Sequence, residues 1–226
     1  DYYGVMAFEV NSDIVKNVPQ DWADLLKPEY KGQVALAGDP RVSAQAQMSV
    51  YGAALANGGT LDDVTAGLEF FKQLNDVGNF VPLVAKQATV AKGETPIIMR
   101  WDYNALADKA ALAGNPNIEV VIPKTGVIAG VYIQAISAYA PHPNAAKLWM
   151  EFLYSNEVQL IWLNGGCHPI RYADLAARNA IPADLANALP PAELYANTVF
   201  PSIDQINAAK TLIAEKWMET VGADVK

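Results

Sequence analysis

The chain has 226 residues, of which 52% are hydrophobic and 18% are charged, so it is a globular protein large enough to bury a core without disulfides. Twenty-four acidic against 16 basic side chains give a net charge of −8, which argues against a nucleic-acid partner. The single cysteine, Cys167, rules out an internal disulfide, and the two histidines argue against a polyhistidine zinc site. No run of about 18 apolar residues occurs that would span a membrane.

The first half of the chain alternates between predicted strands and predicted helices, which indicates an α/β domain with a largely parallel sheet. Strands are predicted over residues 2–10, 33–37, 95–99 and 118–122. Helices are predicted from the N-cap Ser43 to about Asn57, from an N-cap at Thr60 through Leu74, and from about Asp102 to Ala113.

The second half begins with a long apolar segment, residues 126–140, which we expect to be one strand with Gly130 in its middle. Helices are predicted over residues 144–154, 156–163 and about 203–221, with prolines interrupting the segment between the last two.

The chain opens at Asp1 with neither the basic region nor the apolar region of a signal peptide. Its first ten residues already have the pattern of a strand, so we expect a fragment or a processed product. A chain trimmed to its ordered part is the alternative.

Residues 38–45 lie between a predicted strand end and a predicted helix start, which is where open α/β sheets bind ligands. A helix N-terminus suits an anion, and Arg41, Ser43 and Gln45 could add charge and hydrogen bonds. The alternative is an ordinary turn and cap with Arg41 in solvent.

A second junction of the same kind carries Arg100, Trp101, Asp102, Tyr103 and Asn104 in succession. The aromatic rings could stack on a ligand or line a cleft. Asp102 could bind an amine or a hydroxyl, or it could be the helix N-cap.

Tyr132 and Gln134 share one face of their predicted strand by the period-2 rule. A polar pair in an apolar strand indicates either a cleft or a satisfied buried pair.

The adjacent Cys167 and His168 point apart on an extended backbone, so they form no nucleophile–base pair. The sequence contains no GxSxG, P-loop, GxGxxG or HExxH motif, and no convincing pair of carboxylates for acid–base chemistry.

Four stretches in this order resemble the type II periplasmic solute-binding proteins of ABC importers, the group that includes ferric-ion, thiamine and polyamine binders. They are Asp21-Trp-Ala-Asp-Leu-Leu-Lys-Pro-Glu-Tyr-Lys-Gly-Gln-Val34, Ala91-Lys-Gly-Glu-Thr-Pro-Ile97, Ala140-Pro-His-Pro-Asn-Ala-Ala-Lys-Leu-Trp-Met-Glu-Phe-Leu153 and Gly166-Cys-His-Pro-Ile-Arg171. The resemblance implies a mixed, mostly parallel sheet flanked by helices, with one complete lobe and part of another.

The resemblance also implies how the chain is divided. Residues 1–128 together with 170–226 would form the second lobe, and residues 129–169 would be the returning part of the first lobe. A small solute would bind between the lobes without chemical change and without a cofactor, and a permease in the inner membrane would receive it. The implied location is the periplasm.

The residues and the resemblance leave three ligand classes open. An organic anion is favoured, held by Arg41, Ser43, Gln45 and Arg100, with Trp101, Tyr103 and Tyr132 lining the cleft and with Asp102 and Gln134 selecting donors. Ferric ion is the second class, with Tyr103 and Asp102 as ligands. A polyamine is the third, near Trp101, Tyr132 and Gln134.

Two rival interpretations belong to other classes. One is an α/β enzyme on a similar scaffold, for which Asp102 would be the proton-transfer group. The other is a fragment that self-associates by domain swapping.

Overall fold

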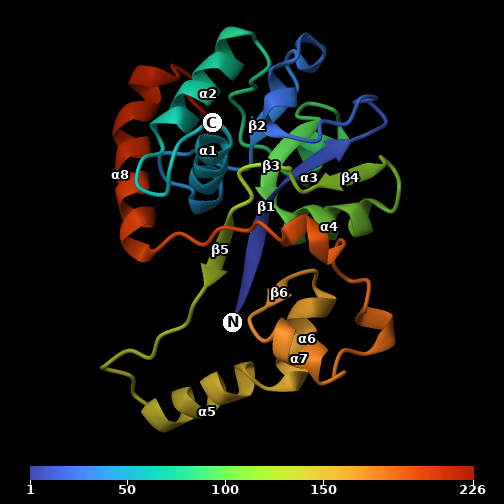
Figure 1. Cartoon of the computed structure of the whole chain (residues 1–226), viewed down its shortest axis with the longest axis vertical. Coiled ribbons are helices and arrows are strands. Elements are labelled where there is room, and N and C mark those ends of the chain that lie inside the picture. The colour runs from blue at the N-terminus through green and yellow to red at the C-terminus, as the bar shows by residue number, and fades with distance from the viewer.

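Strand β1 (Tyr2–Asn11) runs through the middle of the molecule and takes part in two groups of strands. The computed structural model describes residues 1–226. From Met6 onward β1 pairs with β3 (Ile97–Trp101), and from Phe8 onward with β4 (Ile118–Val121). Its first residues pair instead with β5 (Ala129–Tyr132) and β6 (His168–Pro169), which lie below the main sheet in Figure 1. β1 is therefore the strand that the two groups share.

The sheet is mixed, with the order β2-β3-β1-β4 and β2 spanning Val34–Leu36. β2 pairs in parallel with β3, whereas β1 is antiparallel to β3, β4, β5 and β6. The mixed α/β class is therefore confirmed, but the parallel share is smaller than expected. The reason is that β1 lies between β3 and β4 and runs against both.

Helices cover both faces of the main sheet. Helices α1 (Ala44–Ala56), α2 (Thr65–Asp76) and α8 (Ile203–Thr220) lie on one side, and α3 (Gln87–Ala91) and α4 (Asp102–Leu112) lie on the other (Figure 1). The first side holds the largest apolar cluster, with 31 buried residues. It includes Met6, Phe8 and Val10, because alternate residues of β1 point to the same face.

Helix α1 is buried over nine consecutive residues, Ala46–Ala54, because it lies between the sheet, α2 and α8. Small side chains make this close packing possible. A Cβ built on Gly67 of α2 would lie only 2.1 Å from the backbone oxygen of Val50 in α1. The two helices therefore meet backbone to backbone at Gly67.

The rest of the chain forms a second region around the start of β1. It contains α5 (Pro143–Leu153), α6 (Asn156–Asn164) and α7 (Tyr172–Ala177), with α5 extending away from the other elements in Figure 1. Short 3-10 helices complete the fold: Trp22–Leu26, Pro28–Tyr30, Ala183–Leu185 and η4, Ala192–Tyr195. No helix combines the length and the apolar character that crossing a membrane requires.

Most predicted elements are confirmed to within two residues, including the N-cap at Ser43, but two predictions are wrong. Helix α2 begins at Thr65, not at Thr60, because Thr60 accepts the Asp62 amide in a turn that precedes the helix. The strand predicted over 126–140 covers only Ala129–Tyr132. Its register with β1 ends at the pair Tyr2 and Tyr132, and β5 pairs with no other strand.

A cluster of buried charges lies between the sheet and α4. The Arg100 Nη1 atom lies 3.0 Å from the carboxylate of Glu9 and also donates to Asp108, which in turn accepts the Gln87 side chain. Burial raises the pKa of Glu9 to about 7, with Arg100 acting in the opposite direction and Asp108 in the same one. One arginine therefore serves two carboxylates in a place where water does not reach Glu9.

The contact at Gly67 predicts a large effect for a small substitution. Gly67→Ala should lower the free energy of unfolding by about 1–3 kcal/mol, because the added methyl forces α1 and α2 apart. Urea unfolding followed by circular dichroism measures this. Gly165→Ala is the control, since its Cβ would lie no closer than 3.4 Å to any atom beyond its two chain neighbours and its φ is −81°. Equal stability of the two variants would contradict the packing described here.

Glu9 predicts a pH dependence of stability. The pKa of Glu9 is higher in the folded chain than the ordinary 4.5. Its contribution to the free energy of unfolding is therefore full below pH 4.5 and is lost as the pH rises towards 7. Glu9→Gln should remove this slope, which is at most about 1.4 kcal/mol per pH unit. Urea unfolding of both proteins between these pH values tests it, with the exposed Glu29→Gln as the control. Parallel curves for wild type and Glu9→Gln would refute the assignment.

Candidate functional site

Four aromatic side chains gather where β1, α4, β5 and α6 meet. We call this group the tyrosine cluster: Tyr2, Tyr103, Tyr132 and Trp162. The Tyr2 ring stacks on Tyr132 with centroids 4.7 Å apart, and it lies tilted against Trp162 at the same distance. The hydroxyl groups of Tyr103 and Tyr132 are 2.8 Å apart. Tyr132 is 38% exposed, so the cluster can be reached from solvent.

Two glycines allow these rings to lie so close to the strands. Gly4 of β1 and Gly130 of β5 are partners in the antiparallel register. A Cβ on Gly4 would come within 2.6 Å of the Tyr103 ring, and a Cβ on Gly130 would come equally close to the Trp101 ring. Because neither glycine has a side chain, the Tyr103 ring packs directly against the backbone of β1 and the Trp101 ring against that of β5.

The hydroxyl groups of Tyr2 and Tyr103 carry no charge near neutral pH. Burial raises the pKa of the Tyr103 hydroxyl, and its hydrogen bond with Tyr132 raises it further. Burial also raises the pKa of Tyr2. The neighbouring thiol of Cys167 is buried, and its pKa is raised to about 11. The cluster therefore offers ring faces, hydroxyl groups and a neutral thiol.

Asp102 lies directly behind the tyrosine cluster and is fully buried. One of its oxygens accepts the backbone amides of Val5 and Tyr103, each at 2.9 Å. The other lies 2.8 Å from the His168 ring and accepts the Tyr195 hydroxyl at 3.2 Å. Asp102 is the first residue of α4, where the helix dipole favours a negative charge. Both oxygens are thus bonded within the protein, and Asp102 positions Tyr103.

Neither arginine singled out in the sequence is free. Arg41 donates to Asp39, two residues earlier, and to Asp224 at 2.7 Å, 183 positions later in the chain. Arg100 belongs to the buried charge cluster with Glu9 and Asp108. It precedes Trp101 on β3, so strand alternation turns the two side chains to opposite faces of the sheet. Arg100 therefore points away from the tyrosine cluster.

Ser43 and Gln45 have structural partners at the start of α1. The Ser43 hydroxyl is the helix cap and accepts the Ala46 amide. The Gln45 side-chain oxygen accepts the Trp101 amide at 2.8 Å and the Asn104 side chain at 3.2 Å. Gln45 thereby joins α1 to the β3–α4 junction and fixes the place of Trp101.

A small apolar cavity of about 230 Å³ continues from the tyrosine cluster between α1, β5 and α8. Trp101 and Tyr132 line it at the end nearest the cluster, and Met48 and Ala209 belong to its apolar lining. The side-chain amide of Gln47 also lines it and is buried without a hydrogen-bond partner. This cavity extends the space beside the cluster.

Gln134 does not join the other candidates. It lies two residues beyond the end of β5 and is exposed, so the prediction that it shares a strand face with Tyr132 is wrong.

The ferric-ion interpretation gains no support either. Asp102 and Tyr103 bond in different directions, and no group of three or more His, Cys, Asp or Glu side chains is placed to hold a metal.

Comparison with known proteins gives this arrangement a context. Residues 1–207 match a family described as bacterial extracellular solute-binding protein. The chain is 31% identical over 231 aligned positions to the spermidine/putrescine-binding periplasmic protein of Escherichia coli K12, covering 98% of this chain and 58% of that protein. It thus spans less than two thirds of this relative's length. The family and this relative are solute-binding proteins rather than enzymes.

Solved structures agree on the fold. The periplasmic binding protein AfuA of Actinobacillus pleuropneumoniae, solved with fructose-6-phosphate, superposes with a TM-score of 0.70 at 21% identity over 98% of this chain and 67% of that one. An ABC transporter structure from Clostridium perfringens reaches a TM-score of 0.73 at 17% identity, over 97% and 68% of the two chains. With the family match covering most of the sequence, the chain belongs to the bacterial extracellular solute-binding proteins.

Proposed function

We propose that this chain is the ligand-binding part of the substrate-binding component of an ABC importer, and that the tyrosine cluster holds an organic ammonium group. The ligand would be captured outside the cytoplasmic membrane and passed unchanged to a permease. The observation that carries the proposal is the concentration of four electron-rich rings in a site whose neighbouring arginines are both bonded to carboxylates.

The chemistry of the cluster favours a cation over an anion. The face of an aromatic ring is negative, so an ammonium group within about 6 Å of a ring centroid is attracted to it. An anion needs a free cation or free amide groups, and Arg41, Arg100, Ser43 and Gln45 are each bonded elsewhere. The net charge of −8 also attracts cations at long range. The relative from E. coli, whose name specifies spermidine and putrescine, supports the same ligand class.

The division of the chain supports a two-lobed protein. We infer that residues 129–169 belong to a lobe other than the one formed by 1–128 with 170–226. Helix α5 carries Leu148, Trp149 and Phe152 on one face, and these side chains are 71%, 55% and 41% exposed. An exposed apolar face of this kind usually packs against another part of the protein or against a partner. In a protein as long as the relatives, a further part of the same lobe would pack there; a second copy of the chain is the alternative raised by the sequence.

The tyrosine cluster makes a direct prediction about ligand binding. Spermidine or putrescine should bind the chain, and Tyr132→Ala should weaken that binding about tenfold, because it removes a ring that stacks on Tyr2 and faces solvent. Isothermal titration calorimetry at low salt measures both affinities. Fructose-6-phosphate and sulfate serve as anionic probes in the same buffer.

Tyr139→Ala is the matched control, since Tyr139 is 94% exposed and lies outside the cluster. It should leave the affinity for the amines unchanged. Binding of the anionic probes without binding of the amines would overturn the proposed ligand class. Equal effects of the two tyrosine substitutions would show that the amines bind elsewhere.

A further inference from the structure

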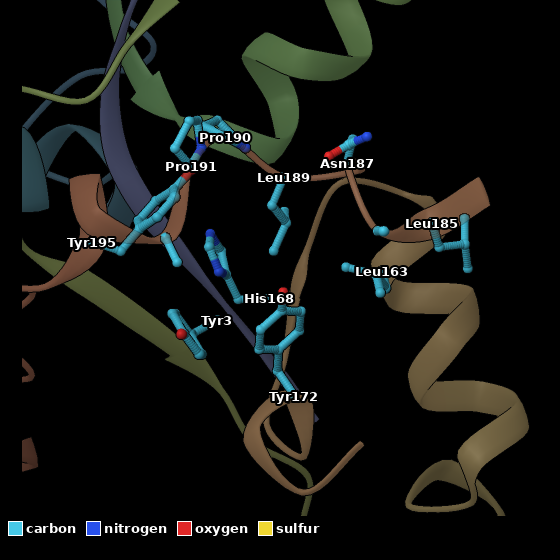
Figure 2. Close-up of a pocket in the computed structure, with 12 residues that line it drawn as sticks. Tyr3, Leu163, His168, Tyr172, Leu185, Asn187, Leu189, Pro190, Pro191 and Tyr195 are labelled. Atoms are coloured by element: carbon cyan, nitrogen blue, oxygen red, sulfur yellow. The ribbon is translucent and has the colours of Figure 1, made fainter. Parts of the chain in front are cut away.

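A second cavity lies on the opposite side of β1 from the tyrosine cluster. Tyr2 and Tyr3 are neighbours on the strand, so their rings point to opposite faces, and Tyr2 belongs to the cluster while Tyr3 lines this cavity. The cavity has a volume of about 650 Å³, within the range of small-molecule sites. We call it the His168 pocket. Figure 2 shows Tyr3, His168 and Tyr195 grouped on one side of it and Leu163 and Leu185 on the other.

His168 is held rigidly at the edge of this pocket. Its ring stacks on Tyr3 with centroids 4.7 Å apart and packs against the edge of Tyr195 at 4.5 Å. Only 4% of the residue is exposed. Packing on both sides fixes the ring orientation before any ligand arrives, which reduces the entropy lost on binding.

The hydrogen bonds of Asp102 determine which nitrogen of His168 carries a proton. Asp102 already accepts two backbone amides and the Tyr195 hydroxyl, so it acts as a carboxylate that only accepts. The His168 Nε2 atom, 2.8 Å away, is therefore the donor in that contact. The other ring nitrogen, Nδ1, makes no hydrogen bond within the protein. In the neutral imidazole this atom is an acceptor.

The lining of the pocket restricts the ligand further. Apart from His168 it contains no ionisable group other than tyrosine, and eight of its 12 residues are hydrophobic. A charged ligand would lose its hydration there without finding a countercharge. The tyrosine rings and the leucines favour a flat apolar body, and Nδ1 favours a ligand that donates one hydrogen bond.

From this arrangement we infer that the His168 pocket is a second ligand site, which takes an uncharged aromatic molecule bearing a hydroxyl group that donates to His168 Nδ1. This site does not depend on the solute that the tyrosine cluster holds. The two sites share Asp102, which contacts His168 through one oxygen and the Tyr103 amide through the other.

The test uses 4-ethylphenol and ethylbenzene as probes of the whole 226-residue chain. They differ in the hydroxyl group that the inference assigns to Nδ1. Titration calorimetry should show that 4-ethylphenol binds at least about tenfold more tightly than ethylbenzene, the value of one well-placed hydrogen bond in an apolar site. In a histidine-labelled sample, nitrogen NMR should show the His168 Nδ1 signal moving with 4-ethylphenol, while the exposed His142 stays unchanged.

A substitution that fills the pocket separates this site from others. Leu189→Trp should abolish binding of 4-ethylphenol, because Leu189 lines the cavity and lies outside the hydrogen bonds of Asp102. Leu194→Trp, which places the same side chain on a neighbouring position outside the pocket, should leave binding intact. Circular dichroism confirms that both variants fold. Equal affinity for the two probes, no binding of 4-ethylphenol, or binding that survives Leu189→Trp would each overturn the inference.

Discussion

The buried carboxylate of Asp102 is the interaction on which the junction between the two regions of the molecule depends. It bonds to β1 through the Val5 amide, to the start of α4 through Tyr103, to β6 through His168 and to η4 through Tyr195. These four segments lie far apart in the sequence. A buried carboxylate is tolerated only when each oxygen is well bonded, so the four partners and Asp102 require one another. One oxygen of this carboxylate faces the tyrosine cluster through the Tyr103 amide, and the other faces the His168 pocket through the His168 ring.

Alternation along β1 separates the two sites. Tyr2, Gly4 and Met6 point to the face that carries the tyrosine cluster and the large core, whereas Tyr3 and Val5 point to the other. Consecutive residues of the strand therefore contribute to the tyrosine cluster on one face and to the His168 pocket on the other. The same alternation on β3 places Trp101 beside Tyr132 of the tyrosine cluster and Arg100 among the buried charges.

Local sequence patterns were sufficient to predict most elements of the fold. Ser43 was correctly predicted as a helix cap because the signal, a hydroxyl before an apolar run, is local. The strand over residues 126–140 was overpredicted, because apolar composition does not show how many of its residues pair with another strand. The antiparallel place of β1 was likewise invisible, since strand direction is set by partners far away in the chain.

The site was harder to predict for the same reason. Trp101, Tyr103 and Tyr132 were expected to line a cleft, and they do lie together, but Tyr2 and Trp162 were missed. The glycines at positions 4 and 130 were the available signal, because each permits a ring to rest on the backbone. Of the two carboxylates that bond Arg41, Asp39 is two residues away, but Asp224 is 183 positions away and could not be foreseen. The type and position of a residue suggest that it could bind a ligand, whereas tertiary contacts decide whether its side chain is free to do so.

Hydrogen exchange of Asp102→Asn tests the role of this carboxylate most directly. Asparagine keeps the size of the side chain but has one accepting oxygen, so it cannot satisfy both pairs of partners. We expect exchange about tenfold faster at the backbone amides of Val5, Tyr103, His168 and Ile170, with no change in α1 and α2. Unchanged protection at the junction, or an equal loss of protection throughout the core, would contradict the view that Asp102 organises the site.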